Sequence, residues 1–405
     1  MADHDIIISG AGYIGLATAV SLKQAAPELD ILVIDAAPEH VWKNDTRASA
    51  VAAAAVRMLS QIGIWEAIEH ESQPITEMIV TDSRTLDPVR PVFLTFGGDA
   101  EPGEPFARMV PNVAMVRELR AKAAAMGMAI EQDVTAVGFA RDAGLSKLAL
   151  KNGQVLSCRL AIACDGVKSR LREAAGIKAT HIDYGQSAIV GTVAHERPHE
   201  GRAEEHFLPA GPFATLPLAG NRSSIVWTES AKDAARILKE DAFVFEAELE
   251  QRFGLKLGAL TFEGKPKSYP LGLTLVRDFV RDGLALAGDA AHGIHPIAGQ
   301  GLNLGFKDAA ALAEVVVEAL RRGEDFGSLG VLERYEQWRR FDTVRMGVTT
   351  DLLNRLFSND NSALRLARTV GLGLVDRLPR LKQFFIGEAA GLSSSSPRLL
   401  SGEAI

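Results

Sequence analysis

The stretch "DIIISGAGYIG", from Asp5 to Gly15, decides the fold, because it joins an apolar run to a helix through three glycines. The continuous apolar run at its start is typical of a parallel strand that is buried on both faces. Apolar residues then recur at helical spacing as far as Gln24, and a second apolar run, "ILVID", ends at Asp35. This strand–helix–strand unit predicts a doubly wound, Rossmann-like domain.

The spacing of the glycines predicts a chemical role for the turn. Gly10 allows a tight turn, Gly12 lets a pyrophosphate approach the backbone, and Gly15 lets the helix pack closely on the strand. The helix N-terminus offers unpaired N–H groups to phosphates, and the carboxylate of Asp35 can accept the hydroxyls of an adenosine ribose. The segment predicts a dinucleotide site but does not separate FAD from NAD. The alternative is a tight turn followed by a surface aspartate.

A second glycine-rich segment, "GDAAHGIHPIAGQGLNLG", follows another apolar run at residues 284–287. Its aspartate ends that run, where a carboxylate can bind a polyol such as a ribityl chain. N–H groups at the start of the next helix can face a flavin ring, where reduction creates negative charge. A second cofactor segment this far from the first favours FAD over NAD. The residues that we expect to hold or face the flavin are Gly288, Asp289, Pro296, Gly299, Gln300, Gly301, Leu302 and Asn303.

Two further patterns have less specific interpretations. His292 and His295 are spaced as zinc ligands can be, but the adjoining Pro296 and glycines disfavour a regular helix and no third ligand is evident nearby. We therefore expect no metal, and we expect both histidines to shape the loop. The segment "CDGVKSRLR", which begins at Cys164, fits either a cofactor contact or a turn in which Ser169 caps the next helix.

Composition excludes several classes of function. The chain has 405 residues and a net charge of −7, which argues against nucleic acid as a partner. Two cysteines cannot form a disulfide framework, so a reducing cytosol fits best. No window reaches the roughly 18–20 apolar residues of a membrane span, and no basic leader precedes the first strand. We expect a cytoplasmic protein and leave peripheral contact with the inner membrane open.

Segments of two kinds alternate along the chain, which predicts two interleaved domains in an α/β fold that is α+β overall. Short buried strands and helices belong to the Rossmann-like domain, whereas residues 184–227 alternate apolar and polar residues as antiparallel strands do. The alanine-rich stretch 48–63 is expected to be one helix. We expect a FAD-binding domain over residues 1–75, 108–175 and 278–330, an antiparallel-sheet substrate domain over 76–107 and 176–277, C-terminal helices over 331–390, and a disordered tail over 391–405.

Together the three segments resemble those of the group A FAD-dependent aromatic hydroxylases, the class of p-hydroxybenzoate hydroxylase. The resemblance implies that the first glycine turn binds the ADP half of FAD and that Asp289 holds the ribityl chain. Arg47, in "DTRAS", stands where this family often keeps an arginine that contacts the cofactor. The family's D-G-x-x-S-x-x-R segment serves both FAD and the nicotinamide cofactor, and it is matched here by Asp165, Gly166, Ser169 and Arg172.

More narrowly, "GDAAHGIHPIAGQGLNLGFKDAAAL" is similar to the corresponding segment of the ubiquinone-biosynthesis hydroxylases. "GPFATLPL", "SSIVWT", "YEQWRRFDTVRM" and "LFS" extend this resemblance over nearly the whole chain. One departure is "FFIGEAAGL", which lacks the basic residue that the family pattern predicts close to Glu388. That difference concerns the C-terminal contacts, including any contact with a partner complex.

The resemblance implies a FAD-dependent monooxygenase that hydroxylates the ring of a polyprenylated phenol through a flavin C4a-hydroperoxide. NAD(P)H is then a transient co-substrate, and O2 and an apolar phenol are the other small-molecule partners. Phe213, Leu216 and Trp227 are the residues expected to contact the phenol. His195 and Tyr184 could both act as the general base, and strand alternation does not say which one faces a cavity.

Two alternatives stay open at this point. A flavin hydroxylase of a small aromatic acid would need a paired arginine in its pocket, and a non-catalytic flavoprotein scaffold in a biosynthetic complex would bind FAD without substrate-stimulated oxygen uptake. The sequence leaves undecided the ring position, the length of the prenyl tail, the choice between NADH and NADPH, and the oligomeric state.

Overall fold

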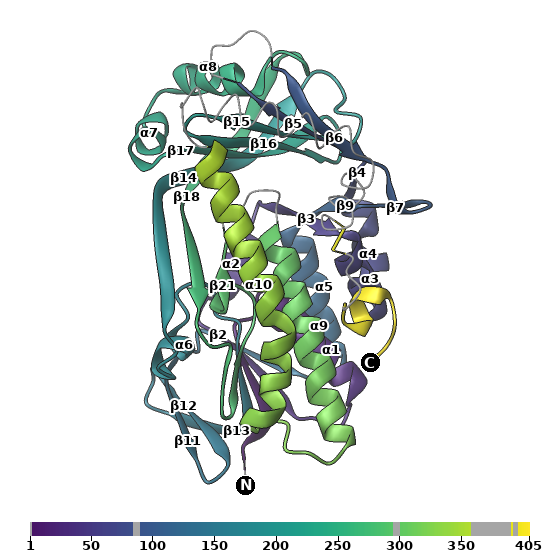
Figure 1. Cartoon of the computed structure of the whole chain (residues 1–405), viewed down its shortest axis with the longest axis vertical. Helices are drawn as coiled ribbons and strands as arrows, with labels where there is room; N and C mark the ends of the chain where they lie inside the picture. Colours follow the sequence, from purple (N-terminus) through teal and green to yellow (C-terminus); the bar gives the residue numbers. More distant parts are fainter. Residues whose placement is uncertain (1, 84–89, 295–299, 358–389, 392–395) are drawn as a thin grey trace.

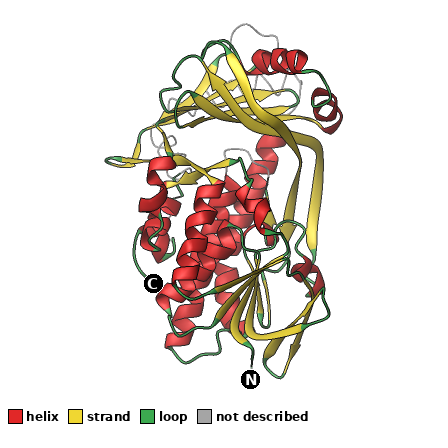
Figure 2. Ribbon diagram, turned by 180° about the vertical axis from the view of Figure 1, so that it is seen from behind, coloured by secondary structure: helices red, strands yellow, loops and turns green. Residues whose placement is uncertain are grey.

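The computed structural model describes residues 2–83, 90–294, 300–357, 390–391 and 396–405. Figures 1 and 2 show two main layers: a sheet with long helices packed beside it, and a broad second sheet that crosses the far end of these helices. The predicted combination of a Rossmann-like part, an antiparallel part and helices late in the chain is confirmed.

The first sheet contains the strand–helix–strand unit predicted from the opening stretch. Its central strands are parallel and largely buried, with Ile6, Ile7 and Ile8 inaccessible to solvent. Helix α1 (Tyr13–Ala25) packs against α5 (Asn112–Ala125) and α9 (Gln300–Arg321). The strands of this sheet are β1 (His4–Ser9), β2 (Ile31–Asp35), β10 (Ala129–Gln132), β11 (Ala136–Asp142), β12 (Leu145–Leu150), β13 (Val155–Ala163), β19 (Val280–Arg281) and β20 (Leu284–Leu286).

The second sheet is antiparallel except where β15 runs parallel to β5. Helices α7 (Ala231–Ile237) and α8 (Ala242–Phe253) cover its outer face, as Figure 1 shows. In spatial order its strands are β21 (His292–Gly293), β18 (Leu260–Val276), β14 (Ala179–His195), β17 (Arg222–Ser230), β16 (Gly211–Leu218), β15 (Arg202–Leu208), β5 (Glu77–Asp82) and β6 (Val92–Gly97).

Two long strands connect the layers. β14 and β18 have 17 residues each and pair in antiparallel fashion along their length. Figures 1 and 2 show them running along one side of the molecule from the second sheet to the Rossmann-like part. The pairing register shifts between Asp183 and Gln186, where Gly185 has a φ of +64°. This bulge lies where β14 begins to pair with β17 in the broad sheet.

A small third sheet corrects the helix expected over residues 48–63. The first five residues of that stretch form β3 (Ala48–Ala52), which pairs with β9 (Ala107–Pro111), and the helix α3 (Ala53–Gln61) begins only afterwards. Alanine spacing does not distinguish the two states, and pairing with a distant strand overrides helix propensity here. The remaining short elements are β4 (Gln73–Ile75), β7 (Asp99–Glu101), β8 (Glu104–Pro105), α2 (Glu39–Lys43), α4 (Trp65–Ile68) and α6 (Arg170–Ala174).

The end of the chain is ordered where the structure describes it. Helix α10 (Leu329–Phe357) packs along α9. The disorder expected for the tail is wrong for residues 396–405, because Leu399 and Leu400 are buried in the core and the Arg398 N–H donates to Glu314 at 2.9 Å. Apolar burial by the two leucines outweighs the polar composition of the preceding serines. Within the described ranges, no helix combines the length and apolarity needed to span a bilayer.

Candidate active site and cofactor crevice

The three glycines of the first turn differ in what the fold requires of them. Gly10 has a φ of +111°, and a Cβ there would lie 2.3 Å from the carbonyl oxygen of Cys164. A Cβ on Gly15 would lie 1.9 Å from the carbonyl oxygen of Gly10. A Cβ on Gly12 would meet no atom within 4 Å. Gly10 and Gly15 are therefore needed for packing, whereas the absence of a side chain at Gly12 leaves open space above the helix N-terminus.

That helix end is suited to an anion. Gly12 is the N-cap residue of α1 and makes no side-chain cap, and the first turn contains no acidic residue. Its N–H groups and the positive end of the helix dipole therefore face the open space. The carboxylate of Asp35 lies beside the turn, where it accepts hydrogen bonds from the N–H groups of Ala11 at 2.7 Å and Ala37 at 2.8 Å.

A cavity of about 300 Å³ lies in front of this turn and is lined by Gly12 and Asp35. Three cationic side chains, Arg47, Arg120 and Lys267, also line it. The Nε atom of Arg120 is buried and has no hydrogen-bond partner among the described residues. A buried donor without a partner beside an uncapped helix end fits the phosphate groups of a dinucleotide. The sequence reasoning missed Arg120, which is one of two arginines in α5 and is distinguished only by its position.

Arg47 contributes to the same cavity through a fixed guanidinium. It forms a paired hydrogen bond with Asp45, with N–O distances of 2.8 Å, and it lies over the ring of Tyr269 at 5.5 Å. The structure therefore places the predicted Arg47 at the rim of the first cavity. Its contact with a cofactor stays a prediction.

The second glycine segment is fixed by a buried ionic cluster. The Gly288 N–H donates to the carboxylate of Asp308 at 3.0 Å. The same carboxylate accepts a hydrogen bond from Nε of Arg339 at 2.8 Å and lies 2.5 Å from Nε2 of His292. Burial opposes ionisation of Asp308, but the charges of His292 and Arg339 hold its pKa below the usual range. Asp308 and Arg339 went unnoticed in the sequence, because nothing in a helix pattern shows that two distant residues meet.

The role of His292 is thus to support the turn. Among the residues that the structure describes, no cluster of three histidine, cysteine, aspartate or glutamate side chains could hold a metal. His295, Pro296 and Gly299 lie outside the described residues, and Gln300 is described only as the first residue of α9.

The two glycine segments converge. A second cavity, of about 290 Å³, is lined by Tyr13 from the first segment and by Asp289, Gly301, Leu302 and Asn303 from the second. Burial raises the pKa of Asp289, although His292 and Arg47 partly oppose this shift.

Contacts among the described residues explain this convergence. A Cβ on Gly288 or on Gly305 would lie 3.3 or 2.8 Å from the side chain of Ile14, so both glycines allow α9 and the second turn to approach α1. The side-chain amide of Asn303 bonds the backbone of Ala50 and Ala52 at 3.0 and 2.8 Å, which fixes β3 to the start of α9.

The D-G-x-x-S-x-x-R segment, from Asp165 to Arg172, supports the second glycine turn from outside the two cavities. Ser169 caps α6 by accepting from the N–H of Arg172 at 3.1 Å, and the guanidinium of Arg172 donates to the carbonyl oxygen of Ala290 at 2.9 Å. Asp165 accepts from the Arg170 N–H at 3.0 Å. None of Asp165, Gly166, Ser169 and Arg172 is among the lining residues of the two cavities. Their direct contact with a cofactor stays a prediction.

The second cavity extends to the inner face of the antiparallel sheet. Apolar side chains of this sheet, including Met78, Leu216 and Val226, form that wall, and Ile75 of β4 and Phe106 next to β9 also line the cavity. Of the three residues expected to contact the substrate, Leu216 is at the cavity, but the expectation is wrong for Phe213 and Trp227. These two side chains are buried on the other face of the sheet, under α7 and α8. Successive residues of a strand face opposite sides, so residues 213 and 216 cannot share a face.

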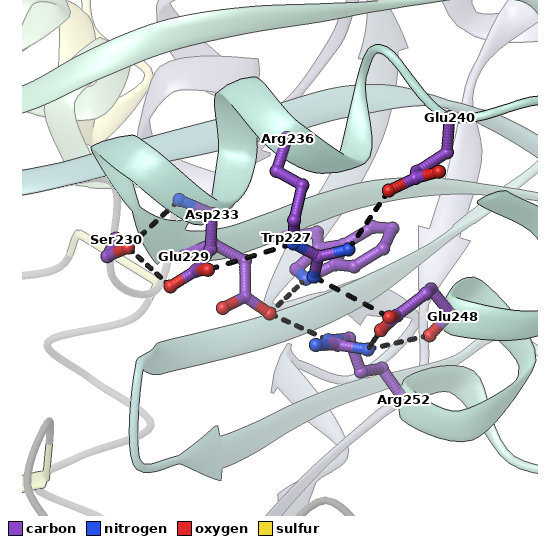
Figure 3. Close-up of polar contacts among 8 residues, drawn as sticks. All are labelled: Trp227, Glu229, Ser230, Asp233, Arg236, Glu240, Glu248 and Arg252. Carbon is purple, nitrogen blue, oxygen red and sulfur yellow. Dashed lines mark hydrogen bonds and ion pairs between the residues drawn. The ribbon is translucent and has the colours of Figure 1, made fainter. Parts of the chain in front are cut away.

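Figure 3 shows how Trp227 is held on that outer face. Its Nε1–H donates to Glu229 at 2.8 Å, and the guanidinium of Arg252 lies 4.7 Å from the indole ring. Arg252 also bonds Glu229 at 2.7 Å and Glu248 at 2.6 Å. The cluster attaches α8 to the sheet and has a structural role.

Trp227→Phe is therefore expected to reduce stability without changing catalysis. The variant loses one hydrogen bond to a charged group, which costs about 2 kcal/mol of unfolding free energy. Urea denaturation measures that loss, and kcat/KM for the substrate should match that of the unaltered chain. Leu216→Ala, on the cavity face, is the matched control and should change KM. A large fall in kcat/KM of Trp227→Phe at unchanged stability would contradict the assignment of the two faces.

Neither candidate base from the sequence is at the cavity. Tyr184 donates to Asp351 on α10 at 2.9 Å, and His195 bonds the carbonyl oxygen of Arg197 at 2.7 Å and the hydroxyl of Ser223 at 3.1 Å. Neither is among the residues that line the cavity, whereas Glu205 is. In the sequence, "AEEHF" showed two adjacent carboxylates, and only the strand register decides which one points inward.

Comparison with known proteins agrees with this geometry. A family model described as "FAD binding domain" matches residues 3–345. The ubiquinone hydroxylase UbiL of Rhodospirillum rubrum is 42% identical over 98% of this chain and 92% of its own length. The chain belongs to this family of FAD-dependent hydroxylases. The 3-demethoxyubiquinol 3-hydroxylase of Escherichia coli is 33% identical to the hydroxylase described here, over 96% of this chain and 98% of its own.

A solved structure supports the fold of this hydroxylase. The p-nitrophenol 4-monooxygenase PnpA of Pseudomonas putida superposes with a TM-score of 0.77 over 96% of this chain and 98% of its own, at 17% sequence identity. The predicted family, the FAD cofactor and the monooxygenase class are confirmed by these relationships.

Proposed function

We propose that this hydroxylase adds a hydroxyl group to the aromatic ring of a polyprenylated phenol in ubiquinone biosynthesis, using NAD(P)H and O2. The observation that carries the proposal is the position of the second cavity. It is lined on one side by Asp289 and Gly301 of the cofactor segments and on the other by apolar side chains of the antiparallel sheet. An apolar ring held there would lie against the cofactor, and relatives named for ubiquinone hydroxylation support the choice of substrate.

The residues present fit the cofactor. The turn at Gly12, with Asp35, Arg47 and Arg120, would hold the ADP half of FAD, and Asp289 would hold its ribityl chain. The carboxylate of Asp35 already accepts two N–H groups, and its remaining lone pairs can accept ribose hydroxyls. When bound, FAD supplies the redox chemistry between NAD(P)H and O2. The chain supplies position, charge complementarity and exclusion of water.

The cavity disfavours a small aromatic acid as substrate. A carboxylate substrate needs an arginine or lysine partner, and no such side chain is among the described residues that line the second cavity. The charged or phenolic side chains on its wall are those of Tyr13, Glu205 and Asp289. A wall with acidic groups and no cation offers an anionic ring no partner, whereas it can accept a neutral phenol.

The function is tested with purified protein and a phenol that carries a short prenyl tail. We expect stoichiometric bound FAD, NADH or NADPH oxidation that increases on addition of the phenol, and a hydroxylated product identified by mass spectrometry. p-Hydroxybenzoate is the control and should not increase the rate. Bound FAD without phenol-stimulated oxygen uptake would instead indicate a non-catalytic scaffold.

The proposal includes peripheral contact with the inner membrane or with a biosynthetic complex, because a polyprenylated substrate partitions into lipid. The protein would then collect its substrate from the membrane surface while remaining cytoplasmic. Flotation with vesicles that contain the phenol tests the membrane contact. Protein that stays at the bottom of the gradient with and without the phenol contradicts it.

A further inference from the structure

Glu205 is a buried carboxyl group on the wall of the substrate cavity. It lies in the middle of β15, where its register partners are Ala214 of β16 and Val80 of β5. The residue is only 4% exposed and is among those that line the second cavity. Its neighbour Glu204 points to the other face of the sheet and forms an ion pair with Lys256 at the surface. The strand therefore directs one of two adjacent carboxyl groups inward.

The surroundings of Glu205 leave its carboxyl group without a protein partner. No hydrogen bond or ion pair joins its side chain to the described residues, and the cavity side chains from β5, β16 and β17 are the apolar Met78, Ala214, Leu216 and Val226. Burial in this apolar wall raises the pKa of Glu205 to about 8. A buried polar group of this kind is costly for stability, so its presence calls for a functional explanation.

Two other titratable groups line the same cavity, and both belong to the cofactor side. Burial raises the pKa of Tyr13 to about 12, with a further contribution from Asp289. Burial also raises the pKa of Asp289. Among the described residues of the sheet side of this cavity, Glu205 is the one that can exchange a proton.

We propose that Glu205 accepts the hydroxyl proton of the phenol during hydroxylation and later returns it; this role rests on the proposed function. The phenol O–H bond breaks as an O–H bond forms on the carboxylate, and the electron pair left on oxygen enriches the ring that is attacked. After oxygen transfer, the proton on the hydroxylated ring carbon passes to solvent water, which restores aromaticity, and Glu205 returns its own proton to the phenolic oxygen. The step needs no reductant or oxidant beyond NAD(P)H and O2.

Physical chemistry favours this carboxyl over an ordinary one. Proton transfer is efficient when the base has a pKa near the working pH and close to that of its partner. A solvated glutamate has a pKa of about 4.3 and a phenol has a pKa of about 10. An apolar site raises the pKa of the carboxyl group and so narrows the difference between the two pKa values. A carboxyl without a protein partner also discriminates against rings that lack a hydroxyl group, because its hydrogen-bonding capacity is then unsatisfied.

The test compares Glu205→Gln with Glu204→Gln, its neighbour on the outer face, both as FAD-loaded full-length protein. Glu205→Gln should keep its FAD and its rate of flavin reduction but lose about 100-fold in product formation, as for loss of a general base. Without that base, the rise of rate toward about pH 8 should disappear, because protonation of Glu205 below this pH removes the acceptor. Glu205→Asp should keep part of the rate and the pH rise, and Glu204→Gln should keep both.

A binding measurement separates this inference from the proposed function. The affinities of the short-tailed prenylphenol and of its methyl ether are measured by their effect on the absorbance of the oxidised flavin. The unaltered protein should bind the phenol more tightly, and Glu205→Gln should bind both alike. Equal affinities in the unaltered protein, or an unchanged rate and pH profile in Glu205→Gln, overturn the role of Glu205. Tighter phenol binding without any hydroxylated product would overturn the proposed function alone.

Discussion

Gly12→Val is expected to fold normally and to be isolated without flavin. A Cβ at this position meets no protein atom within 4 Å, and the backbone φ of −76° suits any residue. The valine side chain would instead occupy the space in front of the helix N-terminus, where we propose that the pyrophosphate of FAD binds. A steric cost of about 3 kcal/mol, typical of overpacking, corresponds to roughly 100-fold weaker binding. Flavin absorbance after purification, followed by titration with FAD, measures the effect.

Gly15→Ala is the matched control, three residues further along the same turn. Its Cβ would lie 1.9 Å from the carbonyl oxygen of Gly10, so the backbone of the turn must shift. This variant should lose stability without FAD, whereas Gly12→Val should be as stable as the unaltered protein or slightly more so, since replacing glycine restricts the unfolded chain. Normal FAD content in Gly12→Val would show that the cofactor lies elsewhere.

Asp308→Asn is expected to reduce the free energy of unfolding by about 3–5 kcal/mol, the usual cost of leaving one member of a buried ion pair alone. Arg339 and His292 are both buried and would lose their carboxylate. The Gly288 turn would lose part of its anchor, so FAD should also bind more weakly. Urea denaturation with and without FAD measures both effects. Asp342→Asn removes the more exposed partner of Arg339 and should cost much less.

The same carboxylate gives an expected pH dependence. The pKa of Asp308 is lower in the folded protein than its ordinary value. Its contribution to stability is therefore complete above about pH 4 and is lost as the pH falls through the lowered folded pKa. Asp308→Asn should lack this part of the acid destabilisation.

The double variant Asp308→Asn/Arg339→Met should recover some stability, because no buried guanidinium is left unpaired. If it recovers none, the stability lost in Asp308→Asn does not come from the Asp308–Arg339 pair.

The parts of the site that depend on local backbone geometry could be predicted from the sequence. Gly10 has a positive φ and a Cβ on Gly15 would meet the carbonyl oxygen of Gly10, so both requirements arise within one turn, and Asp35 ends a strand paired to the first one. Asp289 follows a buried strand in the same way, so its position beside Tyr13 was predictable once the two segments were assigned to one sheet. Features of this kind depend on residues close together in the sequence, so the residue types and their spacing are enough to predict them.

The substrate side depends on register and could not be predicted in the same way. A shift of one residue exchanges the faces of a strand, and alternation does not tell which face is the cavity when both are buried. Phe213 and Trp227 look like an aromatic substrate wall but belong to the core under α8. Glu205 and the Asp308–Arg339 pair become visible only when distant segments are assembled.

The ladder between β14 and β18 also limits how the crevice can widen. Each strand has 17 residues and spans roughly 55 Å at about 3.3 Å per residue. Lateral sliding of the sheet over the glycine turns would break a whole row of backbone hydrogen bonds, whereas flexing at the irregularity near Gly185 breaks few. The two layers would thus open most easily by rotating about the β14–β18 pair. Such an opening would widen the crevice most on the side away from β14 and β18, and we expect a long isoprenoid chain to enter there.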